Sequence, residues 1–91
     1  MTEFLVEQYL ARTNASAVER HGERARRAAE ELARDGTRIH YLRSIFVPED
    51  ETCFYLYEAV SADAVRDAAV RAGLSFERVV EAVGDTKGAE Q

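Results

Sequence analysis

The chain has 91 residues, one cysteine, two histidines and a formal net charge of −5, which corresponds to one small domain. Its hydrophobic and charged fractions, 46% and 32%, are typical of a globular protein and exclude a disordered one. The single thiol excludes an intrachain disulfide and a Cys/His zinc site, and the acidic balance argues against nucleic-acid binding, which needs a basic face.

The first half of the chain predicts a strand, a helix and a second strand. Glu3–Tyr9 is rich in aromatic and branched residues, as strands are. Ser16–Glu19 has the pattern of a capping box, which predicts the start of a helix that ends at Asp35–Gly36. Gly22 lies inside this helix and weakens it by about 1 kcal/mol relative to alanine. Thr37–Val47 then predicts the second strand.

The second half repeats this order. Pro48–Glu51 predicts a turn, and Thr52–Glu58 predicts a third strand. Ser61 is expected to cap a second helix that ends at Gly73, and Glu77–Val83 predicts the last strand.

This β-α-β-β-α-β order predicts an α+β fold, the ferredoxin-like sandwich. Such a domain has a four-stranded antiparallel sheet with both helices on one face. We expect the single domain to span residues 3–83 and the polar residues 84–91 to form a flexible tail.

The face of the sheet without helices is expected to be apolar. Regular alternation places Tyr41 and Ile45 on one side of the second strand but Leu42 and Phe46 on the other. The third strand has the same two-sided character: Phe54 and Leu56 alternate with Cys53, Tyr55 and Tyr57. In a sheet with one solvent-exposed face, apolar and polar residues should alternate along each strand, and here they do not. The face without helices is therefore expected to be covered by another protein surface. We therefore expect a homodimer through the sheet faces, disrupted by Asp at an outward position such as Phe46 or Tyr55.

Several polar residues interrupt the otherwise apolar strands: Glu7, His40, Arg43, Glu58 and Glu81. Glu7 and Glu58 hold equivalent places in the two halves, and we expect them on the same face of adjacent strands. With His40 they form an O,O,N ligand set for a divalent ion. Two alternatives remain open: acid/base chemistry in a pocket, or simple ion pairs of the two carboxylates with Arg43 or Arg78.

A second functional class uses overlapping residues. In a cofactor-free enzyme or small-molecule-binding protein of the dimeric α+β barrel type, Arg43 would anchor an anion and His40 would carry a proton. The walls of that ligand pocket would be aromatic: Tyr41, Tyr55 and Tyr57. An odd separation puts His40 and Arg43 on opposite faces of a regular strand, so this alternative ranks second. The remaining residues of chemical interest, His21 and Cys53, are expected to be a surface residue and a small buried hydrophobe.

Short runs along the chain resemble a family of short bacterial ferredoxin-like proteins that are often labelled nickel-binding. They are FLVE (4–7), YLRS (41–44), ETCFYLYEA (51–59), VRDAA (65–69), RAGL (71–74) and RVVEAV (78–83). The resemblance implies a dimeric protein that binds nickel for sequestration or sensing, and Glu7, His40 and Glu58 remain the candidate ligands. Family members often carry histidine where this chain has Ala68, and cysteine where it has Tyr55.

The sequence also predicts a cytoplasmic location. Residues 1–7 lack the basic and apolar regions of a signal peptide, and no run approaches the roughly 20 apolar residues of a membrane span. A lone thiol is usual in a reducing compartment. We expect no membrane partner and no nucleic-acid partner.

Overall fold

A computed structural model describes residues 1–84 and has the predicted β-α-β-β-α-β order. Its elements are β1 (Thr2–Tyr9), α1 (Ala17–Arg34), β2 (Ile39–Val47), β3 (Thr52–Ala59), α2 (Ala62–Arg71) and β4 (Arg78–Ala82), with the 3₁₀ turns η1 (Arg12–Asn14) and η2 (Pro48–Asp50). The tail predicted at 84–91 lies outside the described residues, apart from Gly84.

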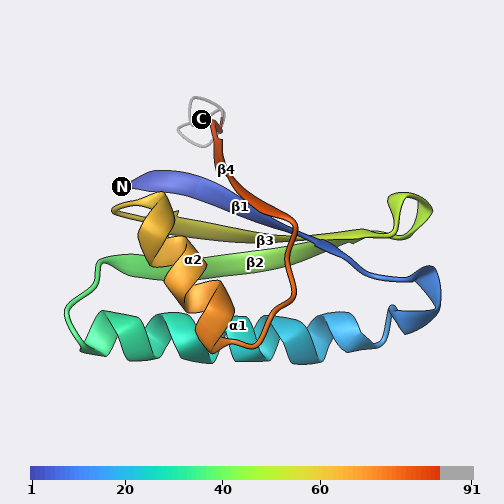
Figure 1. The fold of residues 1–91 in the computed structure, drawn as a ribbon, viewed down its shortest axis with the longest axis horizontal. Coiled ribbons are helices and arrows are strands. Elements are labelled where there is room, and N and C mark those ends of the chain that lie inside the picture. Colours follow the sequence, from blue (N-terminus) through green and yellow to red (C-terminus); the bar gives the residue numbers. More distant parts are fainter. Residues whose placement is uncertain (85–91) are drawn as a thin grey trace, which may run out of the picture.

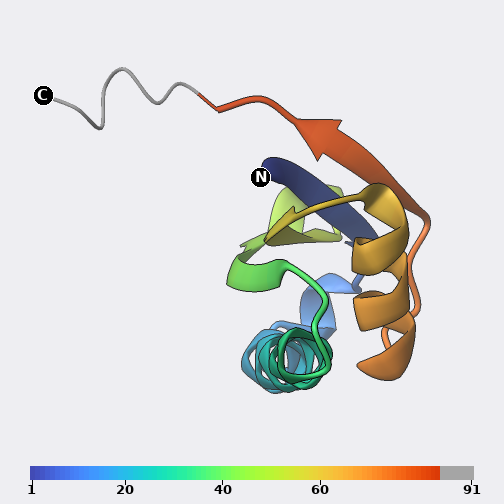
Figure 2. The ribbon, with the colours of Figure 1, turned by 90° about the vertical axis from the view of Figure 1, so that its left-hand side faces the viewer.

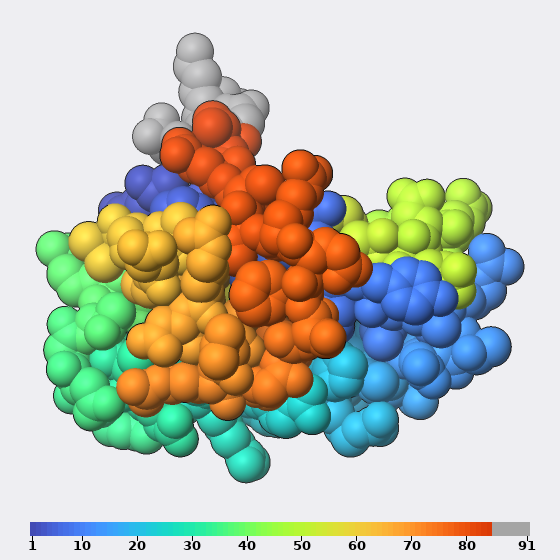
Figure 3. Space-filling model, viewed as in Figure 1, coloured from blue at the N-terminus to red at the C-terminus, as the bar shows by residue number. Residues whose placement is uncertain are grey.

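The four strands form one antiparallel sheet in the order β2-β3-β1-β4, the order of a ferredoxin-like sandwich (Figure 1). Figure 2 shows α1 and α2 side by side on one face of this sheet. Helix α1 packs mainly on β2, whereas α2 contacts β1, β3 and β4. In Figure 3, α2 and the segment that leads into β4 cover the middle of one side of the molecule. The opposite face of the sheet is left uncovered by the helices.

The core lies between the sheet and the helices. Small residues face the sheet from both helices, among them Ala25 and Ala29 of α1 and Ala68 and Ala69 of α2. They let the helices approach closely, and the strands fill the space with large side chains. The largest fully buried strand residues are Tyr55, Tyr57, Ile39 and Val6, and Val65 of α2 is fully buried as well.

The two helices begin differently. The Ser61 hydroxyl accepts a hydrogen bond from the Ala64 amide at 3.2 Å, so the predicted cap of α2 is confirmed. The capping box predicted at Ser16 is wrong, because η1 already turns the chain and Ser16 has helical φ and ψ without a side-chain cap bond. Both helices end as predicted, before glycines with positive φ, 103° at Gly36 and 72° at Gly73.

The β2–β3 turn is fastened to the chain that leaves β1. Its residue Glu51 has φ 46°, accepts the Leu10 amide on its carbonyl at 2.9 Å and accepts the Arg12 amide on its carboxylate at 2.8 Å. These bonds fix the far end of β2 and β3 beside the start of α1, as Figure 1 shows. No helix within residues 1–84 combines the length and apolarity needed to cross a bilayer, and the cytoplasmic location stays a prediction.

Candidate functional site

The uncovered sheet face carries the polar residues that the sequence singles out. On β3, Cys53, Tyr55, Tyr57 and Ala59 are buried under the helices, so Phe54, Leu56 and Glu58 face the other way. Register extends this assignment to the neighbouring strands. The uncovered face therefore has an apolar centre and polar borders. Its apolar residues are Leu5 of β1, Ile45 and Val47 of β2, Phe54 and Leu56 of β3, and Val80 of β4.

A β-bulge at Leu42 changes the facing of β2. Tyr41 pairs with Tyr57 and Arg43 pairs with Leu56, so Leu42 has no partner on β3. Regular alternation is therefore wrong for this strand. His40 and Arg43, three residues apart, lie on the same uncovered face.

The structure also corrects the positions at which an Asp substitution was expected to disrupt the dimer. Ser44 and Phe46 pair with Tyr55 and Cys53, so all four lie on the helix side of the sheet. Phe46 and Tyr55 are thus not outward-facing. Ile45 faces outward, on the side opposite to Phe46.

Three potential metal ligands lie in one row across the uncovered face. Glu58 of β3 pairs with His40 of β2 on one side and with Glu3 of β1 on the other. Directly paired residues have β-carbons about 5 Å apart, within reach of a shared ion for each neighbouring pair. Glu58 and Glu3 are partly buried, whereas His40 is exposed on the edge strand.

Glu7 lies on the same face but outside this row. Its partners are Phe54 on β3 and Arg78 on β4, and its carboxylate accepts the Arg78 Nε–H at 2.8 Å. The ion-pair alternative is thus the observed state of Glu7. Glu7 and Glu58 lie near the ends of their own strands, and β1 and β3 run antiparallel. The two carboxylates therefore lie toward opposite ends of the β1–β3 pair. Among residues 1–84, no three His, Cys, Asp or Glu side chains stand close enough to hold one ion.

The aromatic walls of the alternative pocket lie on the other side of the sheet. Tyr55 and Tyr57 are fully buried beneath the helices, and the Tyr41 ring meets the Tyr57 ring edge-on with centroids 5.5 Å apart. Arg43 and His40 are exposed on the uncovered face. The structure therefore does not bring the predicted anchor and walls together.

A polar cluster lies in the core beneath α1. The Tyr55 hydroxyl donates to Gln8 Oε1 at 2.5 Å, and His21 Nδ1 lies 3.2 Å from both oxygens. Gln8 is only 4% exposed. The prediction of His21 as a surface residue is wrong, since it packs against the sheet. Burial, followed by the charges of Arg24 and Arg20, lowers the pKa of His21.

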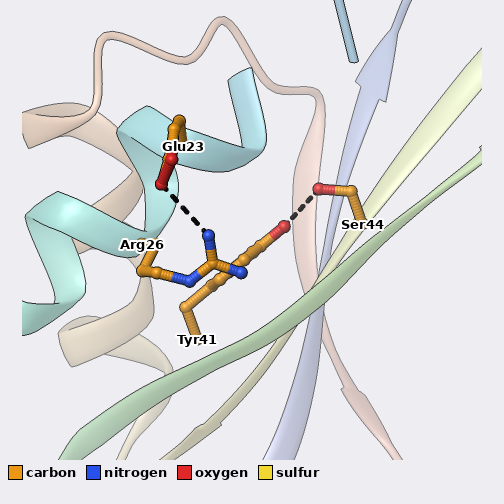
Figure 4. Close-up of polar contacts among 4 residues, drawn as sticks. All are labelled: Glu23, Arg26, Tyr41 and Ser44. Carbon is orange, nitrogen blue, oxygen red and sulfur yellow. Dashed lines mark hydrogen bonds and ion pairs between the residues drawn. The ribbon is translucent and has the colours of Figure 1, made fainter. Parts of the chain in front are cut away.

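A second polar group lies between α1 and β2. The hydroxyls of Tyr41 and Ser44 form a short hydrogen bond, and the Arg26 guanidinium lies 5.3 Å from the centre of the Tyr41 ring (Figure 4). Glu23 accepts from Arg26 at 3.1 Å and holds the guanidinium in place. The sequence does not reveal this group, because the bulge that turns Ser44 toward α1 has no clear sequence signal.

Two buried residues of β3 have no evident chemical role. The Tyr57 hydroxyl is buried without a hydrogen-bond partner among the described residues. Cys53 is buried, as predicted for a small buried hydrophobe, and burial raises the pKa of its thiol, which favours the protonated form.

Comparison with known proteins identifies the family. The family model "Nickel responsive protein SCO4226-like" matches residues 4–82. The chain belongs to this family. The crystal structure of SCO4226 from Streptomyces coelicolor A3(2) superposes with a TM-score of 0.68 at 20% sequence identity. The match covers 91% of this chain and 98% of that one, and it confirms the fold. No curated protein matches the chain.

Membership of this family explains why the short sequence runs resemble it. The name of the family refers to nickel responsiveness. Within this SCO4226-like chain, the uncovered sheet face is the place where candidate ligands gather. Glu3, which is absent from the candidate ligands predicted from the sequence, lies in phase with Leu5 and Glu7 along β1. That phase was the available signal, and the register of β1 on β3 was the missing information.

Proposed function

We propose that this protein binds a divalent metal ion, nickel by family membership, and acts in sequestration or sensing rather than turnover. The family name supports the choice of metal. Imidazole and carboxylate, the ligands available on the uncovered face, suit nickel.

His40 and Glu58 are the proposed ligands, and Glu3, the neighbour of Glu58 on β1, completes the row without forming a three-ligand group among the described residues. The observation that carries this assignment is the direct pairing of His40 with Glu58 across β2 and β3. Glu7 leaves the sequence-predicted set because Arg78 already neutralises its carboxylate. Since β2 is an edge strand, His40 stays accessible to an ion from solvent.

We also propose that the protein is a homodimer that covers the uncovered face. Support comes from the apolar centre of that face, formed by Leu5, Phe54 and Leu56. A contiguous apolar patch on a small domain is a usual site of protein association. A second copy would bury this patch in the interface.

Isothermal titration calorimetry with nickel chloride on tag-free protein tests the metal proposal. We expect saturable binding in the wild type and at least a roughly tenfold weaker affinity in a His40→Ala, Glu58→Ala variant. Glu7→Ala is the matched control, since it removes a carboxylate from the same face and should leave binding unchanged. An absence of heat above the buffer in the wild type, or equal binding by the double variant, would refute the assignment.

One observation favours the rival class, a cofactor-free enzyme or small-molecule-binding protein. The Leu42 bulge puts His40 and Arg43 on one face with Glu58. The two side chains are therefore not on opposite faces, as a regular strand would place them, and they can act at one site. Both side chains are exposed, so they form an open surface site unless a second copy encloses it. Binding of a small carboxylate that is lost in Arg43→Ala but unaffected by chelators would favour this class.

A further inference from the structure

Three charged residues on the uncovered face are unpaired among the described residues. Glu3 and Glu58 are directly opposed on β1 and β3, and Arg43 projects from β2 on the same side. The ion pairs of the described chain involve none of them. Like charges directly opposite each other destabilise a sheet, so the Glu3–Glu58 pair is a place that favours a cation.

The bulge decides where the positive charge lies. Without a bulge, regular alternation would turn Arg43 toward α1 and Leu42 toward the uncovered face. With the bulge, Arg43 of β2 lies beside Leu56 of β3, and Glu58 is two residues beyond Leu56 on β3. Arginine and the acid pair thus flank the centre of the face, where Leu5 pairs with Leu56.

This placement has the symmetry that a two-fold dimer needs. In such a dimer, if one residue contacts a second across the interface, the second contacts the first in return. By register, Arg43 is level with Leu56 and the acid pair is level with Glu58, so the point midway between them falls between Leu56 and Glu58. A two-fold axis that lies between the two sheets, parallel to them, and passes through that point would set each Arg43 over the opposite acids, with the apolar centres of the two copies facing each other.

We propose that Arg43 of each copy binds the Glu3–Glu58 pair of the other copy and thereby fixes the register of the dimer. This inference rests on the proposed homodimer. A guanidinium suits the position, because its planar fork can donate to two carboxylates at once. Burying any of these charges without a partner is costly, so the pairing also selects against other ways of stacking the sheets.

The pairing would regulate metal binding at the same carboxylates. A nickel ion bound by His40 and Glu58 would use the same Glu58 carboxylate that pairs with the partner's Arg43. The metal ion and the guanidinium therefore compete for this carboxylate. Linkage then requires that nickel weaken the dimer by the factor by which dimerisation weakens nickel binding. The metal-free protein is therefore the state in which the pairing is complete.

Sedimentation equilibrium in the presence of a chelator tests the pairing by charge reversal. Arg43→Glu alone and Glu3→Lys, Glu58→Lys together should each raise the dimer Kd roughly tenfold or more. An equimolar mixture of the two variants should dimerise again, because both contacts in the mixed dimer join opposite charges. Arg27→Glu, on the outer side of α1, is the control for charge alone and should leave the Kd unchanged.

The outcomes separate this inference from the proposals on which it rests. A monomeric wild type at high micromolar concentration would refute the homodimer itself. A dimeric wild type with unchanged Arg43→Glu would overturn the pairing only. Failure of the mixture to associate would place the pairing within one copy, which also overturns it. If a reversed variant does not fold by circular dichroism, Arg43→Gln should still weaken the dimer, and no weakening would count against the proposal.

Discussion

Gly22 lies directly over Ser44: a β-carbon on residue 22 would stand 3.1 Å from the Ser44 hydroxyl oxygen and 3.1 Å from that of Tyr41. Such contacts are tighter than ordinary van der Waals contact. The bulge at Leu42 turns Ser44 toward α1, and the glycine leaves room for it. The residue that weakens the helix thus permits the close contact between α1 and β2.

Gly22→Ala should therefore fail to stabilise the protein, although alanine favours a helix by about 1 kcal/mol over glycine. In a Tyr41→Phe, Ser44→Ala background, which removes both hydroxyls, the same change should be stabilising by about 1 kcal/mol. Urea unfolding of the four variants of this cycle measures the coupling. Equal effects of Gly22→Ala in the two backgrounds would show that the contact costs nothing.

The two buried tyrosines of β3 should respond oppositely to loss of the hydroxyl. Tyr55→Phe removes the donor to Gln8 and the contact with His21, and we expect a loss of about 1–2 kcal/mol in the free energy of unfolding. Tyr57→Phe removes a buried hydroxyl that has no partner among the described residues, so it should be neutral or stabilising. Equal losses in the two variants, measured by urea unfolding, would argue that the Tyr57 hydroxyl has a bonded partner after all.

The element order and the fold class could be predicted from the sequence because they depend on local signals. Alternating apolar residues, Ser61 at a helix start and glycines at both helix ends sufficed for the sandwich. The cap at Ser16 failed because the preceding 3₁₀ turn had already given that residue helical dihedral angles. A short turn of this kind has no hydrophobic period to reveal it.

The candidate site was harder to predict because it depends on register. Glu58 was correctly assigned to the same face as Glu7, but only the pairing of β1 with β3 shows that Glu3 is its neighbour. A single extra residue, Leu42, then reversed the facing of the rest of β2. Gln8 shares the phase of Phe4 and Val6, which predicts burial, yet its hydrogen-bond partners come from distant segments.

The stability of the protein should fall as the pH falls below 6.5. Burial and the nearby Arg24 and Arg20 lower the pKa of His21 below its ordinary value of 6.5, so the unfolded chain takes up the proton first. The free energy of unfolding therefore decreases from above pH 6.5 down through the lowered pKa. Gln8 of β1 and Tyr55 of β3, the groups that face the imidazole, are uncharged and do not offset this.

A His21→Gln variant supplies the matched comparison, since it keeps a polar side chain but cannot titrate. Thermal unfolding of both proteins between pH 5 and pH 8 should show a smaller loss of stability in the variant on the acid side. The carboxylates titrate in both proteins and cancel in the difference. Parallel curves over this range would mean that protonation of His21 does not oppose folding.

The two sides of β3 should respond differently to a new charge. Leu56 faces the uncovered side and Tyr55 is fully buried under α1, although they are adjacent in the chain. Leu56→Asp should leave the monomer folded and dissociate the proposed dimer, because it places a charge in the apolar centre of the interface. Tyr55→Asp should instead unfold the protein, because it buries a carboxylate and removes a large core side chain, at a cost of roughly 3–5 kcal/mol. Circular dichroism reports folding and light scattering reports mass, so the two failures are distinguishable. A Leu56→Asp variant that stays dimeric would contradict association through this face.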